Sequence, residues 1–219
     1  MRRYVWLTVF AVAMAYLEAA VVVYLRLLYY PGGFTFPLVI IPGSQALIEI
    51  GREIATLIML WAAGRLGTRG GWPGFAGFMF VFGVWDIFYY VWLKALLGWP
   101  ASLLTWDVLF LVPVPWIAPV LAPILVSLSL IGAAVASEIL GARGRPLRAS
   151  VGEWLGVAAA GLLVILSFTW DAKEIVGGRV PTDFRWALFA VGEALALALL
   201  VRGLRAALAR PRVEGPLHG

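Results

Sequence analysis

The stretch S-Q-A-L-I-E-I-G-R-E-I-A-T-L-I-M-L-W-A-A-G-R-L, residues 44–66, decides the fold. It is mainly apolar but carries Glu49, Arg52 and Glu53 in its interior. Residues three and four apart share one face of a helix, so Glu49 and Glu53 project together with Arg52 beside them. Ionisable groups inside a membrane helix are costly, and they usually pair and face a bundle interior or a hydrated cavity. The stretch therefore predicts a membrane helix that carries a buried polar site.

The composition of the whole chain is typical of a membrane protein. Of its 219 residues, 63% are hydrophobic and only 13% are charged, and the mean hydropathy is +0.94. An ordinary soluble domain carries about 25% charged residues. No polar segment is long enough to fold as a separate soluble domain. We therefore expect residues 1–219 to form one all-α domain, a polytopic transmembrane helix bundle.

Six apolar stretches are long enough to cross a bilayer. We expect spans at about residues 4–26, 44–66, 74–97, 117–140, 153–170 and 184–201. Four prolines interrupt residues 101–123, and they cannot all lie in one regular helix interior. There we expect a short helix containing Asp107 and then a kinked or extended stretch, Pro113–Trp116, before the fourth span. Non-helical backbone at membrane depth is tolerated only where protein covers it or where it lines a cavity.

The basic residues indicate the orientation of these spans. With six spans and the N-terminus inside, the cytoplasmic side holds eleven of the 17 lysine and arginine residues: Arg2, Arg3, Arg65, Arg69, Arg143, Arg145, Arg148, Arg202, Arg205, Arg210 and Arg212. The positive-inside rule then predicts that both termini are cytoplasmic. The net charge of +5 is explained by this topology and by contact with anionic lipid of the bilayer, so we expect no nucleic-acid partner.

Charged residues on the first three spans reach similar depths. At about 1.5 Å per residue, Glu53 lies roughly 14 Å below the outer end of its helix, and Asp86 and Glu18 lie roughly 18 and 21 Å above the inner ends of theirs. In a hydrocarbon core about 30 Å thick, all three reach the middle or outer half. We expect one cluster that opens outward, with Asp107 joining from the proline-broken segment and Glu193 from the last span; its core members are Glu18, Glu49, Arg52, Glu53 and Asp86.

Two interpretations of this cluster remain open. In a static interpretation, Arg52 bridges Glu18 and Asp86, and the network only pins three helices together. In a functional one, a proton, a cation or a small ligand occupies the cluster, because buried carboxylates cannot all stay ionised and unpaired. Carboxylate oxygens suit Mg²⁺, Ca²⁺ or Mn²⁺, but no D-x-D or E-x-x-H spacing accompanies them. Whether the site holds a metal stays undetermined from the sequence.

Several kinds of chemistry are disfavoured by the residues present. The chain has no cysteine, and its single histidine is His218, next to the last residue. The absence of cysteine excludes disulfides and thiolate nucleophiles, and the position of the single histidine disfavours histidine-based acid–base catalysis. There is no phosphate-binding glycine loop, no G-x-S-x-G elbow and no H-E-x-x-H motif. We expect no cofactor, and we do not favour an enzyme.

Three functions are compatible with these features. The leading hypothesis is an inner-membrane protein whose pocket binds or transports a small ligand or cation, with proton coupling as one form. The second is a structural or assembly subunit that associates with another membrane protein or with its own copies. The third is a membrane enzyme acting on a lipid-linked substrate, with Asp107 and Glu49 as acid–base groups and Arg26 or Lys94 on a phosphate.

Four segments of the chain resemble a group of small, uncharacterised bacterial integral-membrane proteins. They are A-Y-L-E-A-A-V-V-V-Y-L-R (15–26), G-R-E-I-A-T-L (51–57), G-V-W-D-I-F-Y-Y-V-W-L-K (83–94) and L-G-W-P-A-S-L-L-T-W-D-V-L-F (97–110). The resemblance implies a multi-pass protein of the bacterial inner membrane. It implies no particular activity, cofactor or partner.

Overall fold

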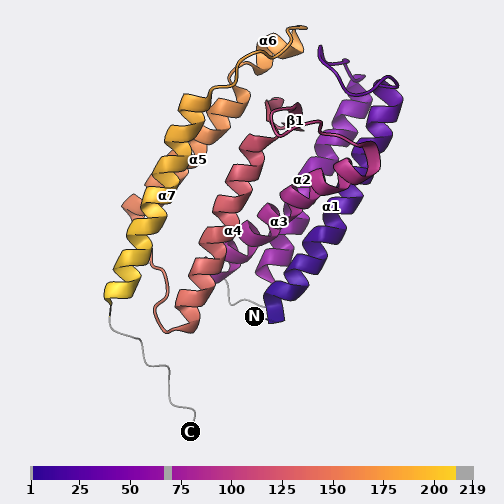
Figure 1. The fold of residues 1–219 in the computed structure, drawn as a ribbon. Helices are drawn as coiled ribbons and strands as arrows, with labels where there is room; N and C mark the ends of the chain where they lie inside the picture. Colours follow the sequence, from indigo (N-terminus) through magenta and orange to yellow (C-terminus); the bar gives the residue numbers. More distant parts are fainter. Residues whose placement is uncertain (1, 67–70, 211–219) are drawn as a thin grey trace.

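The computed structural model describes residues 2–66 and 71–210 as a bundle of long helices with a small β-hairpin near one end (Figure 1). The helices are α1 (Arg2–Tyr29), α2 (Gly43–Arg65), α3 (Gly71–Leu97), α4 (Leu121–Ala142), α5 (Val151–Thr169), the short α6 (Ala172–Val176) and α7 (Trp186–Ala209). The hairpin consists of β1 (Trp106–Phe110) and β2 (Trp116–Pro119). The predicted all-α class is confirmed.

Most of the long helices can cross a membrane. In the described part of the chain, five helical segments are long and apolar enough: α1, α3, α4, α5 together with α6, and α7. Helix α2 has 23 residues, which at about 1.5 Å per residue cover about 34 Å, so its length also suffices. Its composition differs because Glu49, Arg52 and Glu53 lie in its interior. The chain is therefore a multi-pass membrane protein.

Two predicted boundaries needed correction. The fourth helix begins at Leu121 and not at 117, because residues 116–119 form strand β2. The last helix continues to Ala209 and does not end at 201, because alanine, leucine and arginine favour helix beyond that point. The first three helices agree with the predicted spans to within about three residues, a normal uncertainty for helix ends.

The prediction of a short helix around Asp107 was wrong, because Asp107 lies in β1 and is paired with Ala118 of β2 in the antiparallel hairpin. The sequence W-D-V-L-F contains aromatic and β-branched residues that favour a strand. Pro113 and Pro115 fall in the loop between the strands, where their missing N–H groups break no ladder hydrogen bond. The stretch before Trp116 is non-helical, as predicted.

Helix α3 is the centre of the bundle. Helices α1, α2 and α4 all pack against it, and two-thirds of its most apolar window is buried. Helices α5 and α7 pack mainly against each other and form a second layer beside α4 (Figure 1). This second layer meets the first through contacts of α7 with α4 and of α5 with β2. The fold therefore has a tightly packed body, α1–α4, and an attached helix pair.

Two glycines allow α2 and α3 to approach closely. A Cβ atom added at Gly64 would overlap the backbone of Phe78, and one added at Gly77 would overlap the carbonyl oxygen of Gly64. We expect Gly64→Ala to lower the free energy of unfolding by about 1–3 kcal/mol, the usual cost of overpacking. A Cβ atom at Gly51, on the same helix, would meet no atom within 4 Å. Gly51→Ala should therefore raise stability by up to about 1 kcal/mol through helix propensity. Thermal unfolding in detergent should separate the two variants, and equal melting temperatures would contradict this close contact.

Candidate functional site

A cavity of about 350 Å³ lies where the hairpin meets α1, α2 and α3, and we call it the charged cavity. All six residues predicted as the ligand or proton site line it: Glu18, Glu49, Arg52, Glu53, Asp86 and Asp107. They come from four different elements, so no single helix accounts for their convergence. Aromatic side chains complete much of the wall, among them Tyr29, Phe34, Trp85, Tyr89 and Phe110.

Arg52 is the centre of the first ion-pair group in this cavity. Its guanidinium pairs with Glu18 of α1, and its Nε donates a 2.8 Å hydrogen bond to Glu49, three residues earlier on α2. The hydroxyl of Thr56 donates to the other carboxylate oxygen of Glu18 at 3.1 Å. Few direct contacts otherwise join α1 to α2. The group therefore holds these two helices together at membrane depth.

The static interpretation had Arg52 bridging Glu18 and Asp86; the pair with Glu18 is confirmed, but the pair with Asp86 was wrong. Asp86 instead accepts a 2.8 Å hydrogen bond from the hydroxyl of Ser127 on α4. The reason is the close approach of α3 and α4, where a Cβ atom at Gly83 would lie 2.7 Å from the carbonyl oxygen of Ser127. This approach brings the Ser127 hydroxyl to Asp86, whereas Arg52 is occupied by Glu18 and Glu49.

A second guanidinium lies in the same cavity and was missed as a cavity residue by the sequence analysis. Arg26 is only 7% exposed, and its Nη2 donates a 3.0 Å hydrogen bond to Asp107. Its guanidinium carbon lies 3.7 Å from the ring centroid of Trp99 and 4.6 Å from that of Phe34, in cation–π geometry. The available signal was helical spacing, because Arg26 follows Val22 by four residues on the face that also carries Glu18.

Asp107 is the most buried of the predicted site residues, with 1% of its surface exposed. Burial raises the pKa of Asp107 to about 6, and the nearby Arg26 guanidinium acts in the opposite direction. One carboxylate oxygen, Oδ2, has no hydrogen-bond partner among the described residues, and the same holds for Nη1 of Arg26 and Nε1 of Trp85. Tyr90, on α3, lies beside the Asp107 carboxyl group and also hydrogen-bonds to it.

Glu53 and Asp86 are the two acids of the cavity that form no ion pair with a guanidinium group among the described residues. Glu53 is 5% exposed and accepts hydrogen bonds of 2.8 and 3.0 Å from the backbone N–H of Leu111, beyond the end of β1. Asp86 is 8% exposed and has Ser127 as its donor. In the described part of the chain, five carboxyl groups and two guanidinium groups line this cavity. The excess of acid favours a site that is occupied by a cation or by protons.

Other residues considered from the sequence lie elsewhere. Glu193 does not join the charged cavity; its carboxylate accepts a 2.7 Å hydrogen bond from Ser129 and lines a different cavity. The ammonium group of Lys94 donates to the carbonyl groups of Gly98 and Pro100 at 3.0 and 2.9 Å, and thus caps the end of α3. These carbonyl bonds leave Lys94 poorly placed to hold a phosphate.

The acids of the cavity do not form a recognisable metal-ligand group in the described part of the chain. Among residues 2–66 and 71–210, no group of three or more histidine, cysteine, aspartate or glutamate side chains could hold a metal ion. Arg52 pairs with two of the carboxyl groups and Arg26 with a third, and neutral groups donate to the other two. The geometry thus favours a ligand that contacts single carboxyl groups.

Comparison with known proteins adds no further constraint. No protein-family model, no curated protein sequence and no solved structure shows significant similarity to this chain. The charges, contacts and burial of the cavity residues are therefore the basis for the function proposed next.

Proposed function

We propose that this chain is a bacterial inner-membrane protein that binds a small, positively charged ligand in the charged cavity. The observation that carries the proposal is the pair of buried acids, Glu53 and Asp86, that have no guanidinium partner in the described part of the chain. A buried carboxylate is stable only when it is paired, hydrogen-bonded or protonated. A bound cation would supply the missing positive charge.

An organic ammonium ion suits the cavity better than a bare metal ion. The volume of about 350 Å³ falls within the range of small-molecule sites. Trp85 and Tyr89 line the same cavity as the two acids, and aromatic faces attract ammonium groups. An ammonium group can donate hydrogen bonds to one carboxylate at a time, whereas a divalent metal needs several converging oxygens.

The charge distribution along the bundle supports entry from the outer side. The cavity lies toward the C-terminal ends of α1 and α3. The loop that joins α4 to α5 lies at the opposite end of the bundle, near the start of α1 (Figure 1). Basic residues are concentrated at that opposite end, and the positive-inside rule places such an end in the cytoplasm. The resemblance to bacterial integral-membrane proteins supports the same location. In this orientation the cavity opens outward.

Proton coupling follows from the same charge balance. When no cation is bound, protons are the alternative source of positive charge for Glu53 and Asp86. Binding of a cation would then displace protons from the cavity. Binding should therefore tighten as the pH rises, and it should release protons into an unbuffered solution.

A thermal-shift titration of the purified full chain tests the proposal. The probes are methylammonium, tetramethylammonium and butane-1,4-diammonium chlorides, compared with sodium chloride at equal ionic strength. At least one probe should give a saturable stabilisation, which amounts to about 2.7 kcal/mol at a hundredfold excess over the dissociation constant. Glu53→Gln and Asp86→Asn should each weaken the apparent affinity by roughly thirtyfold, which corresponds to about 2 kcal/mol.

Glu138→Gln is the matched control, because Glu138 lies on α4 but does not line the charged cavity. Its titration curve should match that of the unmodified protein. If all three variants responded equally, or if sodium chloride stabilised the protein as much as every probe, the charged cavity would not be a cation site.

A further inference from the structure

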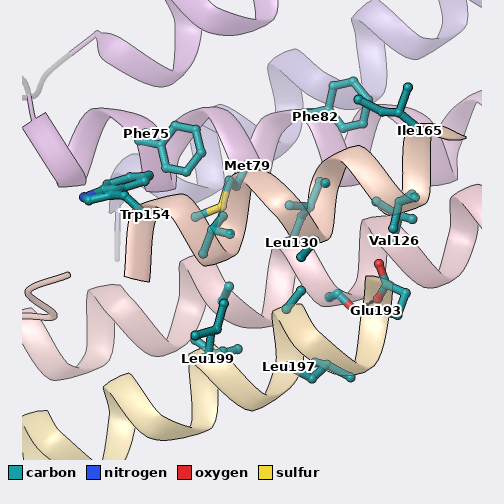
Figure 2. Close-up of a pocket in the computed structure, with 18 of the residues that line it drawn as sticks. Phe75, Met79, Phe82, Val126, Leu130, Trp154, Ile165, Glu193, Leu197 and Leu199 are labelled. Atoms are coloured by element: carbon teal, nitrogen blue, oxygen red, sulfur yellow. Dashed lines mark hydrogen bonds between the residues drawn. The ribbon is translucent and has the colours of Figure 1, made fainter. Parts of the chain in front are cut away.

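A second cavity, of about 370 Å³, separates the two layers of the bundle, and we call it the interlayer slot. Side chains of α3 and α4 line one wall and side chains of α5 and α7 line the other (Figure 2). Nearly all of the labelled side chains are apolar: Phe75, Met79, Phe82, Val126, Leu130, Trp154, Ile165, Leu197 and Leu199. The slot runs along helices that span the membrane, so a hydrocarbon chain is the occupant that its lining suits.

One end of the interlayer slot lies beside the basic loop between α4 and α5. Residues Leu147, Arg148 and Ala149 of this loop line the slot together with Trp154. Arg148 is exposed and forms no ion pair within residues 2–66 and 71–210. Arg145, in the same loop, has a buried Nε without a hydrogen-bond partner among the described residues. An apolar slot with the guanidinium group of Arg148 at its mouth and Arg145 in the adjoining loop matches the two parts of an anionic lipid, the acyl chain and the charged headgroup.

Three carboxyl groups line the slot: Glu153 at the same end as Arg148, and Asp86 and Glu193. Glu153 is paired with Arg202 at 3.1 Å and accepts a 2.7 Å hydrogen bond from the backbone N–H of Ser150. Figure 2 shows Glu193 beside Val126, well away from Trp154. Its carboxylate accepts a hydrogen bond from Ser129. Glu193 therefore does not compete with a headgroup for Arg148, and Glu153 already has Arg202 and Ser150 as partners.

We propose that the interlayer slot binds an anionic phospholipid, with the phosphate at Arg148 and one acyl chain between the two helix layers. Basic pockets between membrane helices on the cytoplasmic side are suited to anionic headgroups. The lipid would fill the space between α4 and the α5–α7 pair, which contact each other only sparsely. The inference rests on the membrane orientation proposed above but not on the ligand of the charged cavity, although Asp86, Leu109 and Phe110 line both cavities.

Native mass spectrometry of the full chain, delipidated in detergent and then mixed with defined lipid, tests this site. The probes are palmitoyl-oleoyl phosphatidylglycerol and palmitoyl-oleoyl phosphatidylcholine, which share acyl chains and differ in headgroup charge. The unmodified chain should retain one phosphatidylglycerol with a preference of about fivefold or more, the factor expected for a basic residue beside an anionic headgroup. Arg148→Gln should abolish this preference. Arg205→Gln, which removes an exposed charge from α7 outside the slot, should leave it unchanged.

A slot-filling variant tests the acyl-chain half of the proposal. Gly161 lines the slot, and a Cβ atom there would meet no atom within 4 Å, so Gly161→Leu can fill space without a backbone clash. It should reduce retention of both lipids, whereas Gly132→Leu, at an open position outside the slot, should not. If Arg148→Gln and Arg205→Gln lowered the preference for phosphatidylglycerol equally, general surface charge would explain that preference, and the proposed lipid site would be rejected. A dimer in the spectrum that survives in Gly132→Leu and is lost in Gly161→Leu would assign the slot to a second copy of the chain instead.

Discussion

Replacing Arg52 by glutamine is expected to lower the free energy of unfolding by about 3–5 kcal/mol, the range for breaking a buried ion pair. The loss is large because Arg52 is the ion-pair partner of both Glu18 and Glu49, each less than a tenth exposed. Glutamine can donate to one of them but supplies no charge. The free energy should be measured by reversible unfolding in mixed micelles.

Two further variants define the cause of this loss. Arg52→Lys keeps the charge but cannot hold two carboxylates with a planar guanidinium group. Its free energy of unfolding should therefore lie between those of the unmodified protein and Arg52→Gln. Arg205→Gln removes an exposed arginine at the cytoplasmic end predicted for α7 and should change stability by no more than about 0.5 kcal/mol. A stability of Arg52→Gln equal to that of Arg205→Gln would show that the Arg52 group does not hold α1 to α2.

The pair of Arg26 and Asp107 gives the second large effect. Arg26→Gln should cost about 3–5 kcal/mol at pH 8, because it leaves the buried Asp107 carboxylate without its counter-charge and removes the cation–π contacts with Trp99 and Phe34. The double variant Arg26→Gln/Asp107→Asn should recover a large part of this loss, since two neutral amides can hydrogen-bond to each other.

The pH dependence of the same variant has a definite sign. The pKa of Asp107 is raised to about 6 by burial, and Arg26 acts to lower it, so removing Arg26 raises it further. A raised pKa means that the folded state binds the proton more tightly than the unfolded chain, so this contribution to stability is lost as the pH rises through the folded-state pKa. The deficit of Arg26→Gln should therefore shrink between pH 8 and pH 5. A deficit that is independent of pH would show that the lost ring contacts, and not the unpaired carboxylate, are its cause.

The convergence of charges was accessible from the sequence because it depends on two regular quantities, helical periodicity and rise per residue. Glu49, Arg52 and Glu53 share a face of α2, and the depths of Glu18 and Asp86 match theirs. The structure places all five around one cavity, together with Asp107. Their role in ligand or proton binding stays a prediction, which the titrations above test.

The pairing of those charges was only partly predictable: Arg52 pairs with Glu18 as expected, but the other partners depend on how each helix is rotated and on how closely neighbouring helices approach. Gly83 brings α3 against the backbone of Ser127, and this contact, not charge, determines the partner of Asp86. Arg26 was considered only as a phosphate ligand at the end of the span predicted for residues 4–26. The helix continues to Tyr29, and its helical face carries Arg26 inward against Trp99.

The β1–β2 hairpin and the separate α5–α7 pair could not be predicted from hydrophobic periodicity either. Residues 106–119 are short, and proline excludes a continuous helix without specifying which strands pair. Every long helix is apolar on most faces, so hydropathy cannot reveal which of them pack together. The interlayer slot follows from the sparse contact between α4 and the α5–α7 pair, which only the packed structure shows.

The most direct test of the central claim is whether the charged cavity is hydrated and attracts cations, and a chain without cysteine allows it to be measured by thiol modification. Val22→Cys places a thiol in the cavity wall without removing a charge. Tyr24→Cys places a thiol on the surface of the same helix that points away from the bundle, where Tyr24 is 70% exposed. The reagents are trimethylammonioethyl and sulfonatoethyl methanethiosulfonate, with each rate divided by that reagent's rate with a free thiol. We expect Val22→Cys in vesicles to react about tenfold or more faster with the cationic reagent, as a cleft of one charge sign concentrates its counter-ion, and Tyr24→Cys to react with neither. No reaction at Val22→Cys, or equal normalised rates for the two reagents, would contradict a hydrated, cation-attracting cavity.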